Sequence, residues 1–300
     1  MDYISAPGNV VDAQGRRQFA NLIPGQRDGT DLDETVFNPT INEVMHCIEQ
    51  SGLTGSSNDE TQLWQAIAKG RLLRVVDVTS SRTYTPGSDA KSLLVQMQGP
   101  GGGGGGALGG SNSSNPAACG SASGAGSWAQ LLINLALLPV ANMQLTIGAP
   151  GLGYRGADGS DGGTTSFGSL VQCNGGRAGT TTGSIAAGKA AWTGQGIGGT
   201  VTYTPTTGMQ MIHALQGANG SSGFLIPNSD GTTASVPVPP IGPDSKMGVG
   251  SGNATTSASD GALGPTSGFG AGAGGTGTVG AGSMTGGVGG MGRILIWELG

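Results

Sequence analysis

Residues 92–106 read SLLVQMQGPGGGGGG, and the change of pattern within this stretch decides the fold class. Its first half places Leu93, Val95 and Met97 at alternate positions, the period of two that is typical of a strand with one buried face. Six consecutive glycines then follow a Gly-Pro pair. The stretch predicts a mainly β protein in which glycine segments take the place of ordinary connections.

Glycine is concentrated in the C-terminal part of the chain. It accounts for 62 of 300 residues, and only 9 of them lie in the first 100. Each glycine costs about 0.5–1 kcal/mol relative to alanine, which is tolerable where a side chain would prevent close approach, as at the axis of collagen. No Gly-X-Y period is present. We therefore expect polyglycine-type packing of extended segments, with three residues per turn and lateral hydrogen bonds; the alternative is a flexible linker.

Short β-like segments lie between the glycine runs. They are residues 72–78, 128–134, 143–147, 164–167, 170–173, 200–203, 209–215 and 293–297. We expect residues 128–134 to pair with residues 143–147 across the Leu137-Leu138-Pro139 connection. Together these segments and the glycine runs form the third predicted part of the chain, a glycine-rich β tip over residues 71–300.

The remaining parts of the chain precede residue 71. Residues 1–37 are polar and without periodicity, which predicts an extended arm ordered by a partner. Residues 38–70 predict a small helical hairpin: Asn38 caps the first helix with Pro39 at its first position, and Gly52 ends it. The second helix is expected to start at the Ser57-x-x-Glu60 box and to carry Leu63, Trp64 and Ile67 on one stripe.

Charge and cysteine content argue against several classes of protein. The chain has 13 Lys and Arg against 18 Asp and Glu, a net charge of −5 without a basic patch, so we expect no nucleic-acid partner. Cys47, Cys119 and Cys173 are too few and too widely spaced for a disulfide framework, and we expect small buried thiols. The first residues lack the features of a signal peptide, which predicts a chain made in a cytoplasm. The longest apolar stretch, residues 128–143, is interrupted by polar residues, so we expect no insertion in a membrane.

Four segments of the sequence read VTSSRTYTPGSDAKSLLVQMQG (78–99), QLTIGAPG (144–151), GTTSFGSL (163–170) and GMGRILIW (290–297). In this order and spacing they resemble the glycine-rich tip domain of bacteriophage tail fibres, and residues 38–67 are similar to the two-helix segment upstream in such fibres. The resemblance covers roughly residues 38–175 and 286–300. It implies a receptor-binding protein at the tip of a phage tail, usually a homotrimer, with stacked polyglycine helices that display variable loops, here residues 176–260.

Catalytic and cofactor motifs are weak in this chain. Residues 151–156 spell GxGxxG, but the glycine-containing turn after them cannot begin the long helix that a dinucleotide site needs. Residues 183–190 nearly spell a phosphate loop, but Ala190 replaces the hydroxyl residue that the motif requires. The two histidines, His46 and His213, are too few for a metal site or a Ser-His-Asp device, and His46 is expected to be a partly buried helix residue. We expect no catalytic residue, no metal and no cofactor.

Acidic residues raise one enzymatic alternative. Glycan hydrolysis needs two carboxyls flanking a bond, and in the glycine-rich part only Asp158 and Asp161 are close in sequence; we interpret them as a solvated or calcium-touching turn. A second cluster, Asp28, Asp31, Asp33 and Glu34, is interpreted as part of the arm, in contact with a partner's basic surface.

Aromatic residues are rare, so each one is informative. Trp64, Trp128 and Trp297 lie on periodic segments and are expected in the core. The candidates for receptor binding lie in glycine-rich or loop surroundings, where stacking on a sugar or a protein surface favours such side chains; they are Tyr154, Trp192, Tyr203, Phe224 and Phe269. Small local cores between glycine runs are the alternative for each.

Taken together, the sequence predicts a non-enzymatic adhesin of the phage virion, located at the tail tip and assembled in the host cytoplasm. Residues 1–70 attach it to a tail or baseplate protein, and residues 38–70 hold a homo-oligomer, a trimer by the resemblance. The glycine-rich tip binds a bacterial surface glycan or an outer-membrane protein. The alternatives are a purely structural baseplate or tail component and a surface-glycan depolymerase.

Overall fold

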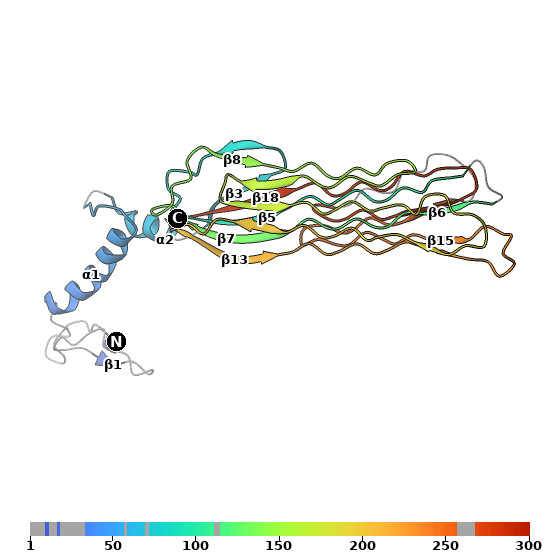
Figure 1. Cartoon of the computed structure of the whole chain (residues 1–300). Coiled ribbons are helices and arrows are strands. Elements are labelled where there is room, and N and C mark those ends of the chain that lie inside the picture. The colour runs from blue at the N-terminus through green and yellow to red at the C-terminus, as the bar shows by residue number, and fades with distance from the viewer. Residues whose placement is uncertain are drawn as a thin grey trace. The chain divides into compact units, whose positions relative to one another are not determined.

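The computed structural model describes residues 10–11, 17–18, 34–56, 59–69, 72–110, 115–256 and 268–300. The chain is mainly β with few helices, which confirms the predicted class at that level. It divides into two compact units, Met1–Leu72 together with Gly300, and Leu73–Leu299. Figure 1 shows the helices in the first unit and almost all the strands in the second. No helix among the described residues has the length and apolar character needed to cross a membrane.

The first unit contains two helices, α1 (Glu34–Gln50) and α2 (Gln62–Lys69), and a short antiparallel pair, β1 (Val10–Val11) with β2 (Arg17–Gln18). The predicted end of the extended arm is wrong, since residues 34–37, with Glu34, belong to α1; apart from β1 and β2, the other residues of the arm, with Asp28, Asp31 and Asp33, lie outside the described residues. The start predicted for the first helix is wrong, since α1 begins at Glu34 and Pro39 lies inside it. Pro39 lies in the second turn of α1, where a proline keeps helical φ but removes one helical hydrogen bond and crowds the preceding turn.

The ends of the helices are set by local hydrogen bonds. Gly52 follows α1 with φ of 77°, and the Leu53 amide donates to the Ile48 carbonyl at 3.2 Å, which confirms the predicted stop. The predicted cap of α2 includes Ser57, which is outside the described residues. Asp59 takes that role: its Oδ1 accepts the Thr61 amide at 2.9 Å.

The second unit is built around a five-stranded sheet with strand order β13-β7-β5-β18-β3. Its strands are β3 (Leu72–Val78), β5 (Ser92–Gln98), β7 (Trp128–Asn134), β13 (Met209–Leu215) and β18 (Arg293–Leu299). The alternation seen in residues 92–98 is confirmed, because Leu93, Val95 and Met97 are fully buried while their neighbours Leu94 and Gln96 are half-buried. One face of this sheet therefore forms one side of the core.

A second five-stranded sheet, of order β12-β10-β9-β8-β4, covers that face. Its strands are β4 (Arg82–Tyr84), β8 (Met143–Thr146), β9 (Thr164–Phe167), β10 (Val171–Asn174) and β12 (Val201–Tyr203). Phe167, Leu145 and Val171 pack from this sheet against Leu131 and Ile296 of the first. The two sheets thus enclose the main hydrophobic core.

The predicted pairing of residues 128–134 with residues 143–147 is wrong. β7 pairs along its whole length with β5 and also with β13, whereas β8 pairs with β4 and β9. β7 has seven residues, and so do β5 and β13, so each can pair with it along its whole length. β8 has only four residues and would leave part of β7 without a partner. The connection through the buried Val140 therefore passes from one sheet to the other.

Two three-stranded sheets lie at the opposite end of the elongated second unit, where Figure 1 labels β6 and β15. One has the order β16-β17-β6 and consists of β6 (Ala117–Cys119), β16 (Ala254–Thr256) and β17 (Thr276–Val279). The other has the order β11-β14-β15 and consists of β11 (Ala191–Trp192), β14 (Phe224–Ile226) and β15 (Val236–Val238). None of these six short strands is predicted from the sequence.

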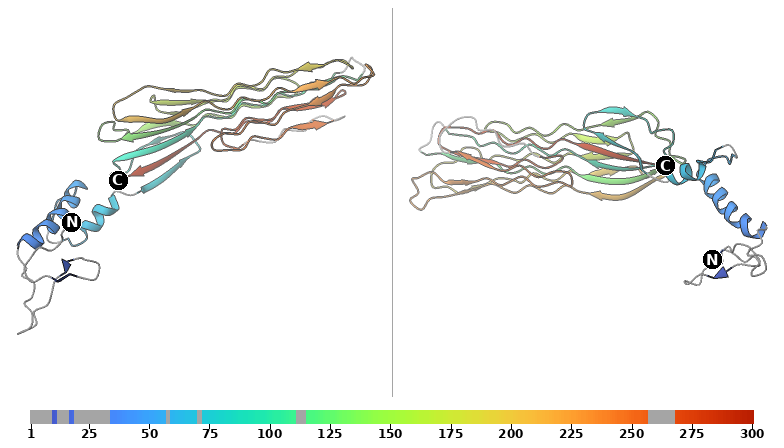
Figure 2. Two further views of the ribbon diagram at one scale, coloured as in Figure 1. Left: turned by 90° about the horizontal axis from the view of Figure 1, so that it is seen from below. Right: turned by 180° about the vertical axis from the view of Figure 1, so that it is seen from behind.

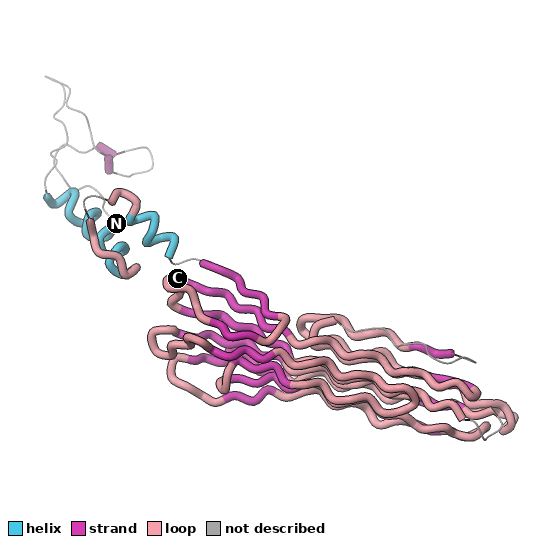
Figure 3. The backbone as a smooth tube through the Cα atoms, turned by 90° about the horizontal axis from the view of Figure 1, so that it is seen from above, coloured by secondary structure: helices cyan, strands magenta, loops and turns pink. Residues whose placement is uncertain are grey.

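Extended segments without strand pairing connect the two ends of this unit. Figure 3 draws them as loops running side by side, and both views in Figure 2 agree. Gly101–Gly106 is one of them and is buried throughout. Its amides donate in a period of three: Gly101 and Gly104 to Gly290 and Gly287, Gly102 and Gly105 to Gly124 and Ser121, and Gly103 and Gly106 to Ser160 and Ala157, all at 2.8–3.0 Å.

Candidate functional site

The structure brings together two of the five predicted receptor-binding aromatics. Trp192 on β11 and Phe224 on β14 are paired across the sheet, and their side chains are 75% and 51% exposed. Tyr154 forms a bridge with Ala157, and Tyr203 ends β12; both are exposed, on other elements.

Phe269 differs from the other four candidates because it is half-buried. The guanidinium carbon of Arg293 lies 4.7 Å from its ring centre, a cation–π contact. Arg293 in turn forms a two-pronged ion pair with Asp77 at 2.9 and 2.7 Å. Phe269 thus belongs to a local packing cluster beside the first sheet.

Trp192 and Phe224 are part of a larger exposed surface on the β11-β14-β15 sheet. Phe224 also pairs with Val238, and Ile226 pairs with Val236 on the next row. Side chains alternate between the faces of a strand, so all five point to the same side. We call this surface the apolar face: Trp192, Phe224, Ile226, Val236 and Val238, each between 43% and 75% exposed.

The opposite side of the same sheet is packed, which holds the apolar face in place. Leu225 is 3% exposed and packs with Ala117 and Cys119. Pro237 lies so close to Gly277 that a β-carbon there would be 2.7 Å from the proline Cβ. The exposed side chains therefore stand on a layer that has little room to move.

Hydrogen bonds fix the two ends of the short strands. Thr193 and Gly223 exchange two bonds: the Thr193 amide donates to the Gly223 carbonyl at 3.0 Å, and the Gly223 amide donates to the Thr193 hydroxyl at 2.7 Å. The Ser235 hydroxyl donates to the Lys189 carbonyl at 2.7 Å, which ties the start of β15 to the loop before β11. The apolar face contains no charged side chain, so it can bind a partner by burial of apolar surface and by aromatic contact.

Sequence reasoning missed Ile226, Val236 and Val238. The available signal was two short apolar runs, Phe224-Leu225-Ile226 and Val236-Pro237-Val238, whose outer residues are of the aromatic and β-branched types that favour strands. Three residues are too short a run to separate a strand from a loop by periodicity alone.

The carboxylates considered for hydrolysis are engaged in hydrogen bonds. Asp161 accepts from the Arg177 guanidinium at 2.9 Å and from the Ala178 amide at 2.8 Å, and Asp158 accepts from the Thr181 amide at 2.7 Å. Both therefore fasten neighbouring segments. In the part of the chain that the structure describes, no group of three or more His, Cys, Asp or Glu side chains is placed to hold a metal ion.

The two phosphate-type motifs lie in extended structure. The amide of Gly151 donates to the Gly101 carbonyl at 2.9 Å, so the first glycine of residues 151–156 packs against the six-glycine run. Ile185, within residues 183–190, forms a bridge with Ala117. Neither segment leads into a helix.

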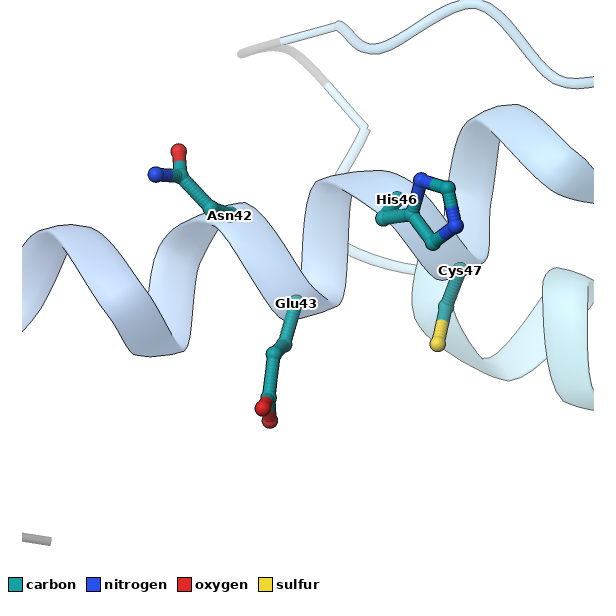
Figure 4. Close-up of a pocket in the computed structure, with 4 residues that line it drawn as sticks. All are labelled: Asn42, Glu43, His46 and Cys47. Carbon is teal, nitrogen blue, oxygen red and sulfur yellow. The ribbon is translucent and has the colours of Figure 1, made fainter.

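A hollow of about 500 Å³ lies along α1, lined by Asn42, Glu43, His46 and Cys47, which Figure 4 draws as sticks. Two expectations about these residues are wrong, since both the His46 and the Cys47 side chains are exposed. Both are exposed, whereas the next residue of the helix, Ile48, is buried. Cys119 and Cys173 are buried as expected.

The expected core tryptophans also need correction. Trp64 is 63% exposed, because the apolar stripe of α2 has more width than α1 covers in one chain. Trp128 and Trp297 are half-buried on the side of the first sheet that faces away from the second. No protein-family model matches the chain, and no curated protein is significantly similar to it.

Proposed function

We propose that the chain is a receptor-binding protein of a bacteriophage tail tip, a non-enzymatic adhesin. The observation that carries this proposal is the apolar face, a five-residue exposed surface on a packed sheet at one end of an elongated unit. Surfaces of contiguous exposed apolar residues mark sites of association. The resemblance of the sequence to tail-fibre tips supplies the biological setting.

The proposal includes a polyglycine-type core that acts as a rigid support. Two features favour it. The period of three in the bonds of Gly101–Gly106 fits a helix with three residues per turn. The same period recurs in residues 121–126, where Ser121 and Gly124 donate to Thr180 and Arg177, and Ala122 and Ala125 donate to Ser221 and Ala218.

We place this support within one protomer, a proposal favoured by the fact that all six amides of Gly101–Gly106 find an acceptor in their own chain. We assign the homo-oligomer, a trimer, to residues 38–70 instead. Leu63, Trp64 and Ile67 on α2 are 38%, 63% and 50% exposed, which leaves an apolar stripe for another copy to cover. Attachment to a tail or baseplate protein is assigned to residues 1–70, and the assembled protein to the tail tip of the virion.

The physical character of the apolar face supports the proposal of receptor binding. Aromatic side chains have few rotatable bonds and here stand on a packed layer, so the entropy cost of ordering them on binding is reduced. Trp and Phe supply the large buried areas that dominate such contacts. An outer-membrane protein or the apolar side of a surface glycan offers a matching surface.

Binding of the purified full chain to a panel of bacterial strains tests this function. We expect saturable binding to the host strain, and comparison of intact cells with cells stripped of surface polysaccharide identifies the receptor class. Unchanged capsule and lipopolysaccharide lengths after incubation are expected of an adhesin, and shortening would indicate a depolymerase. A chain that is present in the particle but binds no strain would be a structural component.

A further inference from the structure

A second hollow, of about 240 Å³, lies on the second unit, and none of its lining residues belongs to the β11-β14-β15 sheet. Its wall combines aromatic, aliphatic, polar and charged side chains with glycine backbone. The side chains are Trp128, Leu215, Gln216, Asp244, Ser245 and Lys246. Nothing in the function proposed above uses this hollow.

Paired strands fix one side of the hollow. Trp128 is the first residue of β7, Leu215 is the last of β13, and the two are directly opposite in the register. The imidazole of His213 stacks on the indole with 6.0 Å between ring centres. The imidazole therefore packs against the indole at the wall of the hollow.

A hydrogen-bonded turn fixes the other side. The Ser245 amide donates to the Gly248 carbonyl at 2.9 Å, and the Met247 amide donates to the Ser245 hydroxyl at 3.1 Å. The Gly250 amide donates to Asp244 Oδ1 at 2.7 Å, which aims the carboxylate. The hollow is thus formed before any ligand arrives.

Two charged groups in this wall have unused bonding capacity. Across the described residues, Asp244 Oδ2 accepts no hydrogen bond and the Lys246 ammonium has neither an ion pair nor a hydrogen bond. The Gln216 amide reaches only the Gly198 carbonyl, at 3.5 Å. The wall of the hollow accordingly combines a carboxylate acceptor, an ammonium donor and a side-chain amide with the indole of Trp128.

We propose that this hollow binds one neutral pyranose ring, such as a terminal hexose or N-acetylhexosamine. One side of a pyranose is rich in C–H groups and packs on an aromatic ring, while its adjacent hydroxyls both donate and accept, as Asp244 and Lys246 require. The volume lies below the roughly 300–1,000 Å³ of sites for drug-sized ligands, which suits a single ring. The inference does not depend on the apolar face or on the phage setting.

Titration of the full chain with a panel of monosaccharides, followed by tryptophan fluorescence, tests the proposal. The panel contains hexoses, 6-deoxyhexoses, heptoses and N-acetylhexosamines, with free glycine as a zwitterionic competitor for the Asp-Lys pair. We expect at least one sugar to give a saturable change that is lost in Trp128→Phe. Asp244→Asn and Lys246→Ala should each weaken binding about tenfold or more, since each removes a hydrogen bond to a charged group.

Matched controls are Asp89→Asn and Lys189→Ala, which remove the same groups at exposed positions elsewhere. These variants should bind like the wild type, and all variants should keep the wild-type circular dichroism spectrum. The proposal is overturned if no sugar of the panel binds. It is also overturned if glycine binds in place of the sugars, or if folded Asp244→Asn and Lys246→Ala proteins keep the wild-type affinity.

Discussion

The backbone of Leu152 lies so close to Gly103 that a β-carbon on Gly103 would be 2.1 Å from the Leu152 carbonyl oxygen. The obstacle is main chain, which cannot rotate away as a side chain can. All six glycines of residues 101–106 meet main-chain oxygens in this way, at 1.9–2.4 Å. Even one methyl group must therefore separate neighbouring segments.

Gly103→Ala is expected to destabilise the chain by at least about 1–3 kcal/mol, the usual cost of overpacking, because lateral hydrogen bonds are stretched along with the contact. Gly103→Val should prevent folding. Gly194→Ala is the matched control, since its β-carbon would meet only the Thr180 hydroxyl at 3.6 Å, and its effect should stay within about 0.5 kcal/mol. Thermal melts of the three variants decide between a packed core and a linker; equal curves for Gly103→Ala and Gly194→Ala would contradict the packed core.

Trp192→Ala and Phe224→Ala are expected to reduce binding to host cells strongly. Each removes a large aromatic side chain from the apolar face, and truncation of such residues in an interface typically costs about 2 kcal/mol or more, a factor of about 30 in affinity. Leu137→Ala removes an apolar side chain of similar exposure, 61%, outside the apolar face, and should bind normally. The measurement is a cell-binding isotherm for each variant. Wild-type binding by the double variant Trp192→Ala/Phe224→Ala would show that the apolar face does not bind the receptor.

Acid should destabilise the second unit through Glu298, which is 2% exposed and accepts hydrogen bonds from Arg74, from the Tyr84 hydroxyl at 2.7 Å and from the Gly87 amide at 3.2 Å. Burial alone raises the pKa of Glu298, but these bonds outweigh it and lower the pKa below its ordinary value near 4.5. A lowered carboxyl pKa contributes stability that is present above about pH 4.5 and is lost as the pH falls through the folded-state value.

The melting temperature should therefore decrease as the pH is lowered below about 4.5. Glu298→Gln should lower the melting temperature at pH 7 and should make its decrease in acid, the acid limb of the curve, less steep. The expected loss at pH 7 is roughly 1–3 kcal/mol, because buried donors lose a charged acceptor. Asp77→Asn is the comparison: Asp77 is 45% exposed and paired with Arg293, so its loss should cost less than about 1 kcal/mol. An acid limb that is as steep in Glu298→Gln as in the wild type would assign the pH dependence to other groups.

Light scattering of the purified chain should give a multiple of 29.3 kDa. Trp64→Glu places a charge in the exposed apolar stripe of α2 and should shift the mass toward that of one chain. Glu60→Gln, outside the stripe at an exposed position, should leave the oligomer intact. A monomeric wild-type chain at micromolar concentration would refute the assignment of oligomerisation to residues 38–70.

Thiol titration of the native chain should detect Cys47 alone. Burial raises the pKa of both Cys119 and Cys173 to about 12, so neither forms the reactive thiolate at neutral pH, whereas Cys47 is exposed. A disulfide-exchange reagent should therefore react with one equivalent per chain near neutral pH and with all three thiols after denaturation. Cys47→Ser should leave no fast-reacting thiol; two fast equivalents in the native wild type would place a second thiol at the surface.

The long strands could be predicted from the sequence because their signal is local. Residues 92–98 alternate over seven positions, enough for a period of two to stand out, whereas residues 209–215 stand out as a mainly apolar run without glycine or proline. The pairing of residues 128–134 could not be predicted, since the choice of partner depends on which strands form the other layer of the core. The burial expected for Trp64 is wrong for a related reason. An apolar stripe predicts that one face of a helix is covered, but it does not show whether the cover comes from the same chain or from a partner.

The candidate site was predictable only in part. Trp192 and Phe224 stood out because aromatics are rare in this chain, but their neighbours Ile226, Val236 and Val238 lie in runs of three. What brings them together is a set of contacts between segments far apart in the sequence, such as Pro237 against Gly277 and Leu225 against Cys119. No local pattern encodes such contacts.

The glycine contacts described for residues 101–106 also bear on how stability changes with temperature. Unfolding raises the heat capacity by about 0.45 cal/mol/K for each Å² of apolar surface that water reaches, whereas newly hydrated peptide groups lower it by about 0.26. Glycine segments bury peptide groups and almost no hydrocarbon, so the heat capacity of unfolding per residue should be unusually small. The curve of stability against temperature is then broad and flat, and the same fold persists over a wide range of temperature.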